Sequence, residues 1–257
     1  MTTPLIELID VAKRYRNIIA LHGISLRVGA GEVTCVLGDN GAGKSTLIKI
    51  MAGLHQQDEG RLRVDGEDVR LSSPREALDR GIATVYQDLA VVSLMPVWRN
   101  FFLGSERYGG IWPVRSLRVE EMRATTHAEL AKMGIDLPDV DAPIGTLSGG
   151  QRQCVAIARA VYFGARMLIL DEPTAALGVK QSGVVLKYIA AARDAGFGVI
   201  FITHNPHHAF LVGDHFVLLH RGRMRLDTTR AAITIDELTQ QMAGGDDLVA
   251  LSRDLAR

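Results

Sequence analysis

The segment that most constrains this chain is GDNGAGKST, which spans Gly38–Thr46. It fits the pattern G-x-x-x-x-G-K-[ST], whose fixed positions here are Gly38, Gly43, Lys44 and Ser45. Glycine lets the backbone turn tightly, so that consecutive N–H groups point at phosphate oxygens. The segment therefore predicts a loop that holds the phosphates of a nucleotide.

The residues on either side of this loop agree with that prediction. Val33–Gly38 is a short apolar run, typical of a strand buried on both faces, and STLIKIMAG reads as a helix that ends at Gly53. A helix that begins at the loop adds the positive end of its dipole. We expect Lys44 to reach the β- and γ-phosphates of ATP and Ser45 to bind Mg²⁺. The expected nucleotide contacts in the loop are Gly38, Asp39, Asn40, Gly41, Ala42, Gly43, Lys44, Ser45 and Thr46.

A second group of functional residues is predicted at the end of another apolar run. Met167–Leu170 is continuously apolar and is followed directly by Asp171 and Glu172. A buried strand that ends in aspartate can bring this carboxylate to a Mg²⁺ beside the phosphates. Glu172 points elsewhere and is expected to polarise the attacking water as a general base. Together with the loop, these residues predict hydrolysis of MgATP.

The remaining patterns divide the chain into three parts. Up to about Tyr86 the sequence predicts strands, turns and the one helix, including a hairpin at Leu62–Val69. Between about 88 and 150 the strand-like runs stop, and a helical lobe is predicted from the spacing of Val119, Met122, Leu130 and Met133.

From Gln151 onward, predicted helices and buried strands alternate, which favours a parallel α/β sheet. A short strand at Arg223–Leu226 and an amphipathic helix near Ile235–Met242 are expected to follow.

Charge and composition argue against several classes of protein. Lys+Arg and Asp+Glu number 29 each, so the chain lacks the basic excess of a duplex-binding protein. Cys35 and Cys154 lie in apolar stretches and are predicted to be reduced, buried thiols. The N-terminal sequence does not resemble a signal peptide, and no stretch approaches the roughly 20 apolar residues that span a bilayer. We expect a soluble protein that meets a membrane only through a partner.

LSGGQRQ, at Leu147–Gln153, connects these motifs to a known family. With the phosphate loop and MLILDE, it resembles the nucleotide-binding subunit of an ABC transporter, whose signature motif is LSGGQ. The three motifs come in the family's order, and the resemblance covers about Leu5–Leu226. It implies an α/β P-loop core with an antiparallel β subdomain and an inserted helical subdomain. We expect one domain over 1–257, with the helical insert at about 88–150 and a helical tail over 227–257.

The signature also has a direct physical interpretation. Its serine and glycines stand just ahead of a helical run, forming a second helix start rich in N–H groups. One chain has a single phosphate loop, so a second phosphate-binding start favours a second molecule. In the family, two subunits pack head to tail, and each signature covers the ATP that the other's loop holds. The resemblance implies a homodimer, or a dimer with a paralogue, in which the partner's ATP contacts Leu147, Ser148, Gly149, Gly150 and Gln151.

Three further positions match the family one at a time. Gln87, in TVYQD, resembles the glutamine that contacts Mg²⁺ and senses the membrane partner. His204, in FITHN, resembles the switch histidine at the γ-phosphate, and Tyr15, in KRYRNIIAL, resembles the aromatic residue that stacks on adenine. The implied catalytic residues are Lys44, Glu172 and His204, and the implied Mg²⁺ ligands are Ser45, Gln87 and Asp171.

The chain departs from the family in the loop after DEPT. The family commonly reads S-A-L-D there, whereas Ala175–Gly178 reads A-A-L-G. That loop normally crosses the dimer interface, so Gly178 removes a charged contact and puts the coupling between the two ATP sites in doubt. His207 and His208 follow His204 closely, but no cysteine or carboxylate joins them in the sequence to suggest a metal site.

The stretch Val97–Glu106 and the segment AALGVKQ resemble the carbohydrate-uptake branch of bacterial importers. The resemblance implies import of a pentose or hexose monosaccharide from the cytoplasmic face of the inner membrane. The implied partners are transmembrane permease subunits and, indirectly, a periplasmic solute-binding protein. The aromatic residues of this stretch fit either a permease-docking groove near Gln87 or the core of the lobe; they are Trp98, Phe101 and Phe102.

Three alternatives remain open from the sequence. An exporter would use the same ATPase. A soluble ABC ATPase acting on nucleic acid or the ribosome would usually add a coiled-coil insert or a second cassette with a basic linker, and neither is visible here, so no nucleic acid partner is expected. A small-molecule kinase with a phosphate loop should lack LSGGQ.

Overall fold

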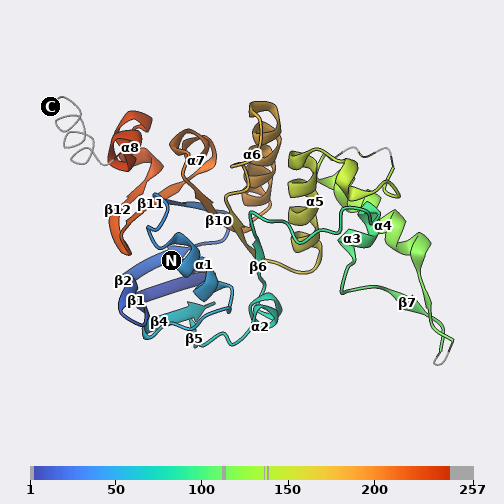
Figure 1. Ribbon diagram of the computed structural model, residues 1–257, viewed down its shortest axis with the longest axis horizontal. Helices are drawn as coiled ribbons and strands as arrows, with labels where there is room; N and C mark the ends of the chain where they lie inside the picture. Colours follow the sequence, from blue (N-terminus) through green and yellow to red (C-terminus); the bar gives the residue numbers. More distant parts are fainter. Residues whose placement is uncertain (1–2, 112–113, 136, 138, 244–257) are drawn as a thin grey trace.

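The core of the protein, in a computed structural model that describes residues 3–111, 114–135, 137 and 139–243, is a six-stranded sheet (Figure 1). The strand order is β12-β11-β3-β10-β9-β6. All neighbours pair in parallel except β12, which runs antiparallel to β11 at one edge. The parallel sheet predicted from the alternating pattern is confirmed. Its strands are β3 (Val33–Leu37), β6 (Ile82–Val85), β9 (Met167–Asp171), β10 (Gly198–Thr203), β11 (His215–His220) and β12 (Arg223–Thr229).

Side chains alternate across this sheet and divide the protein into two cores. On one face, residues such as Cys35 and Phe201 pack with α5 (Gly149–Tyr162), α6 (Val179–Asp194) and α7 (Pro206–Val212). On the other face, residues such as Val36 and Ile202 pack with α1 (Lys44–Met51) and a second sheet. A sheet covered on both faces accounts for the continuously apolar strands.

The second sheet is antiparallel, with the strand order β2-β1-β4-β5. Its strands are β1 (Ile6–Tyr15), β2 (Ile18–Val28), β4 (Glu59–Val64) and β5 (Glu67–Val69). The predicted hairpin is present, because β4 and β5 are joined by Asp65 and Gly66, which have φ angles of 52° and 82°. Figure 1 shows this sheet and α1 on the side of the core opposite α5, α6 and α7.

The region between β6 and α5 contains the short α3 (Val97–Phe101) and the longer α4 (Val119–Lys132). It is not wholly helical: a small hairpin, β7 (Tyr108–Gly109) with β8 (Ser116–Leu117), extends away from it (Figure 1). The three aromatic side chains of the α3 region belong to the core, since Trp98 is 7% exposed and both phenylalanines, Phe101 and Phe102, are fully buried. The alternative that they form a docking groove is wrong.

The remaining helices connect and close the core. They are α2 (Pro74–Asp79) and α8 (Ile235–Met242), with single 3-10 turns at Ile144–Thr146 and Arg230–Ala232. The predicted helix near Ile235–Met242 is confirmed, and it begins with reciprocal hydrogen bonds between Thr234 and Glu237. The part of the predicted C-terminal tail from 244 to 257 lies outside the described residues. Within the described part of the chain, no helix has the length and apolar character needed to cross a membrane.

Both cysteines are fully buried, as predicted, and neither forms a disulfide. Burial disfavours the thiolate, so it raises the pKa of Cys35 well above its usual range and the pKa of Cys154 to about 12. These thiols are therefore packing groups rather than nucleophiles.

Candidate nucleotide-binding and hydrolysis site

The site is assembled at one edge of the parallel sheet, where four neighbouring strands end. The phosphate loop follows β3, His204 follows β10, Glu172 follows β9 and Gln87 comes soon after β6. The strand register aligns these ends, because Leu37 pairs with Thr203 and Ile202 pairs with Asp171. Parallel α/β sheets bind ligands at this carboxyl-terminal edge. Topology thus brings together residues that are far apart in the sequence.

The phosphate loop borders a cavity of about 390 Å³. Its backbone requires glycine: at Gly38, with φ of 144°, a Cβ atom would lie 2.4 Å from the carbonyl oxygen of Leu219. Gly43 has φ of 108° and precedes α1 as an N-cap with no side-chain hydrogen bond. The first N–H groups of α1 are therefore not satisfied by a capping side chain, which suits a phosphate ligand.

Lys44 and Asp171 supply charge to the same edge of the sheet. Lys44 is 8% exposed, and its Nζ donates hydrogen bonds to the carbonyl oxygens of Gly38, at 2.6 Å, and of Asp39, at 3.1 Å. Burial raises the pKa of the Asp171 carboxyl, and the neighbouring Glu172 carboxylate raises it further, while Lys44 lowers it. A bound cation would relieve this carboxylate. Since Ser45 adds a hydroxyl oxygen, the donor chemistry fits Mg²⁺.

Glu172 and His204 lie together at the ends of adjacent strands. His204 Nδ1 is 2.9 Å from Glu172 Oε2, which joins the predicted general base to the predicted switch histidine. The Glu172 side chain is 10% exposed, whereas that of His204 is 60% exposed. Glu172 has a left-handed backbone, with φ of 48°, and its N–H donates to the carbonyl oxygen of Ile202 at 3.0 Å. A carboxylate held in this way can orient a water molecule for attack on a phosphorus atom.

Tyr15, the predicted adenine contact, is not one of the residues lining the cavity. It ends β1, pairs with Ile18 across the turn, and places its ring edge-on to His55 with 5.6 Å between the ring centroids. The cavity wall next to it is aliphatic and comes from β2 as Ile18, Ile19 and Ala20. Tyr15 therefore flanks the cavity. The β2 residues that form the wall of the cavity were not predicted from the sequence.

The β11–β12 turn, Arg221–Gly222, is a second wall that the sequence reasoning missed. The N–H of Gly222 donates to the carbonyl oxygen of Ala42 at 2.9 Å, and its own carbonyl accepts from His22 at 2.8 Å. Both turn residues have positive φ, as a two-residue hairpin requires. An Arg-Gly pair between two strands predicts a turn, but only the tertiary structure places this turn beside the phosphate loop.

The signature residues lie apart from this cavity. Ser148 caps α5: its hydroxyl accepts from the Gln151 N–H at 3.3 Å, and its own N–H donates to Gln151 Oε1 at 2.9 Å. At Gly149 a Cβ atom would lie 2.6 Å from Cδ2 of Leu177, so α5 begins against the loop that follows Glu172. None of the residues from Leu147 to Gln151 lines the nucleotide cavity.

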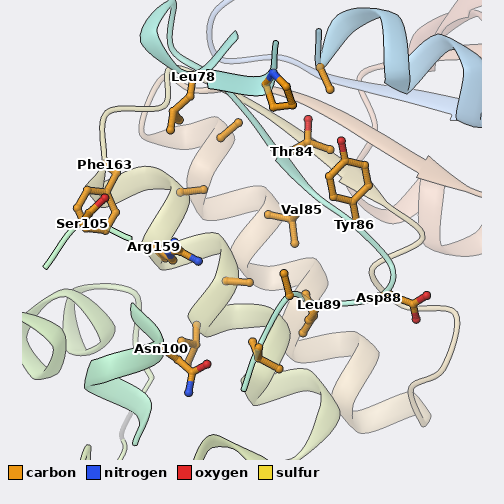
Figure 2. A pocket seen from close by; sticks show the side chains of 18 of the residues that line it. Leu78, Thr84, Val85, Tyr86, Asp88, Leu89, Asn100, Ser105, Arg159 and Phe163 are labelled. Atoms are coloured by element: carbon orange, nitrogen blue, oxygen red, sulfur yellow. The ribbon is translucent and has the colours of Figure 1, made fainter. Parts of the chain in front are cut away.

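Gln87 is exposed, and its two neighbours line a second cavity of about 300 Å³. This cavity lies between α2, β6 and α5, and most of its lining is apolar. Figure 2 shows Leu78, Arg159 and Phe163 around one part of it, and Tyr86, Asp88 and Leu89 around another. A groove next to the predicted partner-sensing glutamine thus exists, but its wall comes from β6 and α5 rather than from the aromatic residues of α3.

Sequence comparison places these features in one family. The ABC transporter family model matches residues 21–175, from β2 to the loop after Glu172. The chain belongs to this family.

Relatives with assigned names are similar over most of the chain. It is 41% identical to the xylose/arabinose import ATP-binding protein of Sulfolobus acidocaldarius, over 93% of both chains. It is 39% identical to the fructose import ATP-binding protein of Rhizobium meliloti, over 95% of both. It is 38% identical to a ribose import ATP-binding protein of Rubrobacter xylanophilus, of which it spans only 46%.

Solved structures agree on the fold. A nucleotide-free ATP-binding cassette from an ABC transporter superposes with a TM-score of 0.78 at 26% identity, covering 88% of this chain and 91% of its own. A dimeric cassette bound to ADP and phosphate gives a TM-score of 0.71 at 26% identity, covering 88% of this chain and 98% of its own. The fold is that of the P-loop ABC ATPases, and the chain is an ATPase of this family.

Proposed function

We propose that this chain hydrolyses ATP to drive a monosaccharide importer. The observation that carries the proposal is the 41% identity, over 93% of both chains, to an ATP-binding protein for xylose and arabinose import. A fructose and a ribose import protein follow at 39% and 38% identity. Because relatives for different sugars are almost equally similar, the ATPase sequence points to the class of solute and leaves the choice of sugar to the partners.

The site supports a specific division of roles. Lys44 and the loop N–H groups hold the triphosphate of ATP, and Ser45, Asp171 and Gln87 hold Mg²⁺, which neutralises charge on the phosphates when bound. Glu172 acts as the general base, and His204, hydrogen bonded to its carboxylate, orients it toward the γ-phosphate. Tyr15, beside Ile18 at the edge of the cavity, stacks on adenine.

Two copies of the chain form the working unit, as a homodimer or with a paralogue. The separation of the signature from the chain's own nucleotide cavity supports this arrangement, since the start of α5 is then available to the ATP of a partner. A dimeric cassette with ADP and phosphate, 26% identical, provides a related precedent.

The apolar groove beside Gln87 is the proposed docking site for a permease subunit. Its lining suits an apolar helix segment. The chain then works at the cytoplasmic face of the inner membrane, with a periplasmic solute-binding protein acting on the far side of the permease.

Two measurements test the proposal. Glu172→Gln should lose hydrolysis but keep MgATP and elute from size exclusion as a dimer; a monomer at saturating MgATP would contradict the head-to-tail arrangement. Pull-down from solubilised membranes should recover polytopic proteins, and cells lacking the chain should lose uptake of a labelled pentose or hexose. Recovery of ribosomal proteins, or unchanged uptake of every monosaccharide tested, would overturn the importer.

The groove can be tested separately. Leu89→Asp, within its lining, should abolish permease capture while leaving the basal ATPase activity intact. Val92→Asp, nearby, 45% exposed and outside the lining, is the matched control and should capture permease normally.

A further inference from the structure

Two histidines of the segment that follows β10 contact the loop that follows β9. His204 Nδ1 lies 2.9 Å from Glu172 Oε2, and His208 Nδ1 lies 3.0 Å from the hydroxyl of Thr174. The first contact joins residues with proposed roles at the γ-phosphate. The second joins two residues to which neither the motifs nor the family resemblance gives a role.

The second contact is the more protected one. Thr174 is 4% exposed, and His208 is half-buried, whereas the His204 side chain is 60% exposed. Burial lowers the pKa of His208, and the nearby His207 and His204 lower it further, so the ring is held in its neutral form. A neutral imidazole has one donor and one acceptor nitrogen, and a hydroxyl can take either role.

His208 is itself fixed in place by the start of α7. Asn205 caps this helix, its Oδ1 accepting from the His208 N–H at 3.1 Å, and Pro206 occupies the first turn. The N–H of Asn205 in turn donates to the Thr203 hydroxyl at 3.1 Å. The imidazole therefore stands at a defined position relative to the end of β10, which also carries His204.

The loop held by His208, Glu172–Gly178, connects two functional regions. At one end Glu172 has the left-handed φ of 48°, a conformation that a non-glycine residue keeps only when surrounding contacts hold it. At the other end Leu177 lies against Gly149 of the signature, and its N–H donates to the carbonyl oxygen of Thr174 at 3.3 Å. Thr174 is thus the anchored centre of a loop that runs from the proposed general base to the signature.

We propose that His208 is a positioning residue: by holding Thr174, it keeps Glu172 directed at its own nucleotide and Leu177 seated on the signature that serves the partner. This inference rests on the proposed role of Glu172. His208 supplies from within the chain a tie to a loop that has glycine at position 178, where the family has a charged residue. It acts on turnover and does not touch the nucleotide.

The test uses the full chain and compares hydrolysis with direct binding of a fluorescent ATP analogue. His208→Ala and Thr174→Val should each lower kcat about tenfold while the Kd of the analogue stays within about twofold, because only a transition-state arrangement is disturbed. His208→Asn, whose amide can replace Nδ1, should recover most of kcat. His207→Ala is the matched control, an exposed histidine one position earlier, and should behave as the parent chain.

The double variant decides whether the two residues act together. His208→Ala combined with Thr174→Val should lose no more than either single variant, since both remove one contact. Additive losses, unchanged kcat in Thr174→Val, or equal losses of kcat and nucleotide affinity would overturn the proposal. If His208→Ala does not fold, Thr174→Val and His208→Asn still decide it. Glu172→Gln separates the two ideas, because normal hydrolysis in that variant would remove the proposed general base itself.

Discussion

The helix starts at α1 and at α5 both contain glycine, but they differ in how their backbone donors are used. At α1 the N-cap is Gly43, with no side-chain hydrogen bond, and Lys44 stands beside it with its ammonium folded over the loop. At α5 the N-cap is Ser148, which exchanges hydrogen bonds with Gln151 and completes the helix by itself. The first start has no capping side chain on its backbone donors, whereas the second is capped within the chain.

This difference indicates separate duties for the two starts. The α1 start lies in a cavity and carries the charge of Lys44, so we expect it to set the affinity for the nucleotide. The α5 start is preformed and lies outside that cavity, so it can meet a second nucleotide only when another molecule brings one. We therefore expect binding to depend on the first start and turnover to depend on both.

Lys44→Ala should have the largest effect. Loss of the ammonium beside the phosphates should lower ATP hydrolysis by about 100-fold, about 2.7 kcal/mol of barrier, and should weaken binding of ATP by a single chain. Lys49→Ala, an exposed lysine of the same helix, is the control. Intact nucleotide affinity in Lys44→Ala would contradict this assignment, because binding would not then depend on the α1 start.

Ser148→Asp should come next. Aspartate caps a helix as well as serine, so α5 should remain folded, but its charge would repel the partner's triphosphate. Hydrolysis should fall about 30-fold, about 2 kcal/mol, with single-chain nucleotide affinity unchanged. Ser148→Asn, a neutral cap, should stay close to the parent chain. A matching loss in the asparagine variant would show that the serine itself, rather than the absence of charge, is required.

A mixture of the Lys44→Ala and Ser148→Asp variants tests whether the two helix starts serve the same site from different chains. A dimer of Lys44→Ala with Ser148→Asp has one site with both defects and one with neither. At equal amounts, half of the dimers are mixed, so about one quarter of the parent activity should return if the sites work independently. Titration of one variant into the other, followed by phosphate release, measures this recovery. A mixture no more active than its components would contradict a shared site, or show that both sites must be intact.

Arg221→Ala should have a smaller effect on the α1 side alone. Its turn lines the nucleotide cavity, so loss of the guanidinium should weaken binding of ATP about fivefold, about 1 kcal/mol. The difference in ATP affinity between the parent chain and Arg221→Ala should become smaller as the ionic strength rises, because salt screens the charge of the guanidinium. Arg223→Ala, exposed and outside the lining, is the control. Equal affinities of the parent and Arg221→Ala at low salt would remove this residue from the site.

Asp171→Asn should have the smallest of these measured effects on stability, a slight rise in Tm. Its effect on activity should have the opposite sign, a loss of hydrolysis. The folded-state pKa of Asp171 is raised by burial, so its ionised form costs stability at neutral pH, and this cost disappears as the pH falls through the raised pKa. The amide should therefore raise Tm by about 2 °C at pH 7, with the difference shrinking toward pH 4, while Mg²⁺-dependent hydrolysis is lost. Asp79→Asn, at an exposed position, should not change Tm. A lower Tm for Asp171→Asn would show that its charge is compensated within the chain.

Much of the site was predictable because its motifs are local. A glycine loop ahead of Lys44, a serine cap ahead of Gln151 and two carboxylates after an apolar run each act through neighbours within a few residues, so the sequence displays them directly. The parallel sheet was predictable for a similar reason, since strands covered on both faces must be continuously apolar.

The residues that were not predicted from the sequence reach the site through contacts between distant segments. Ile18 and Arg221 reach the cavity only because β2 and the β11–β12 turn are hydrogen bonded around the phosphate loop. The α3 aromatics could belong to core or groove, because apolar spacing shows that a face is covered without showing what covers it.

The sequence alone was enough to predict the phosphate loop, the helices that begin at this loop and at the signature, and the buried strands, because these follow from side-chain type and spacing along one segment. It did not predict α2, which lies in a region where only one helix was expected. Only the tertiary structure decided which strand ends meet, so only it could place His204 on Glu172, His208 on Thr174 and Arg221 at the cavity. The physical reason is that register between strands is set by packing across the whole core, and no short segment carries that information.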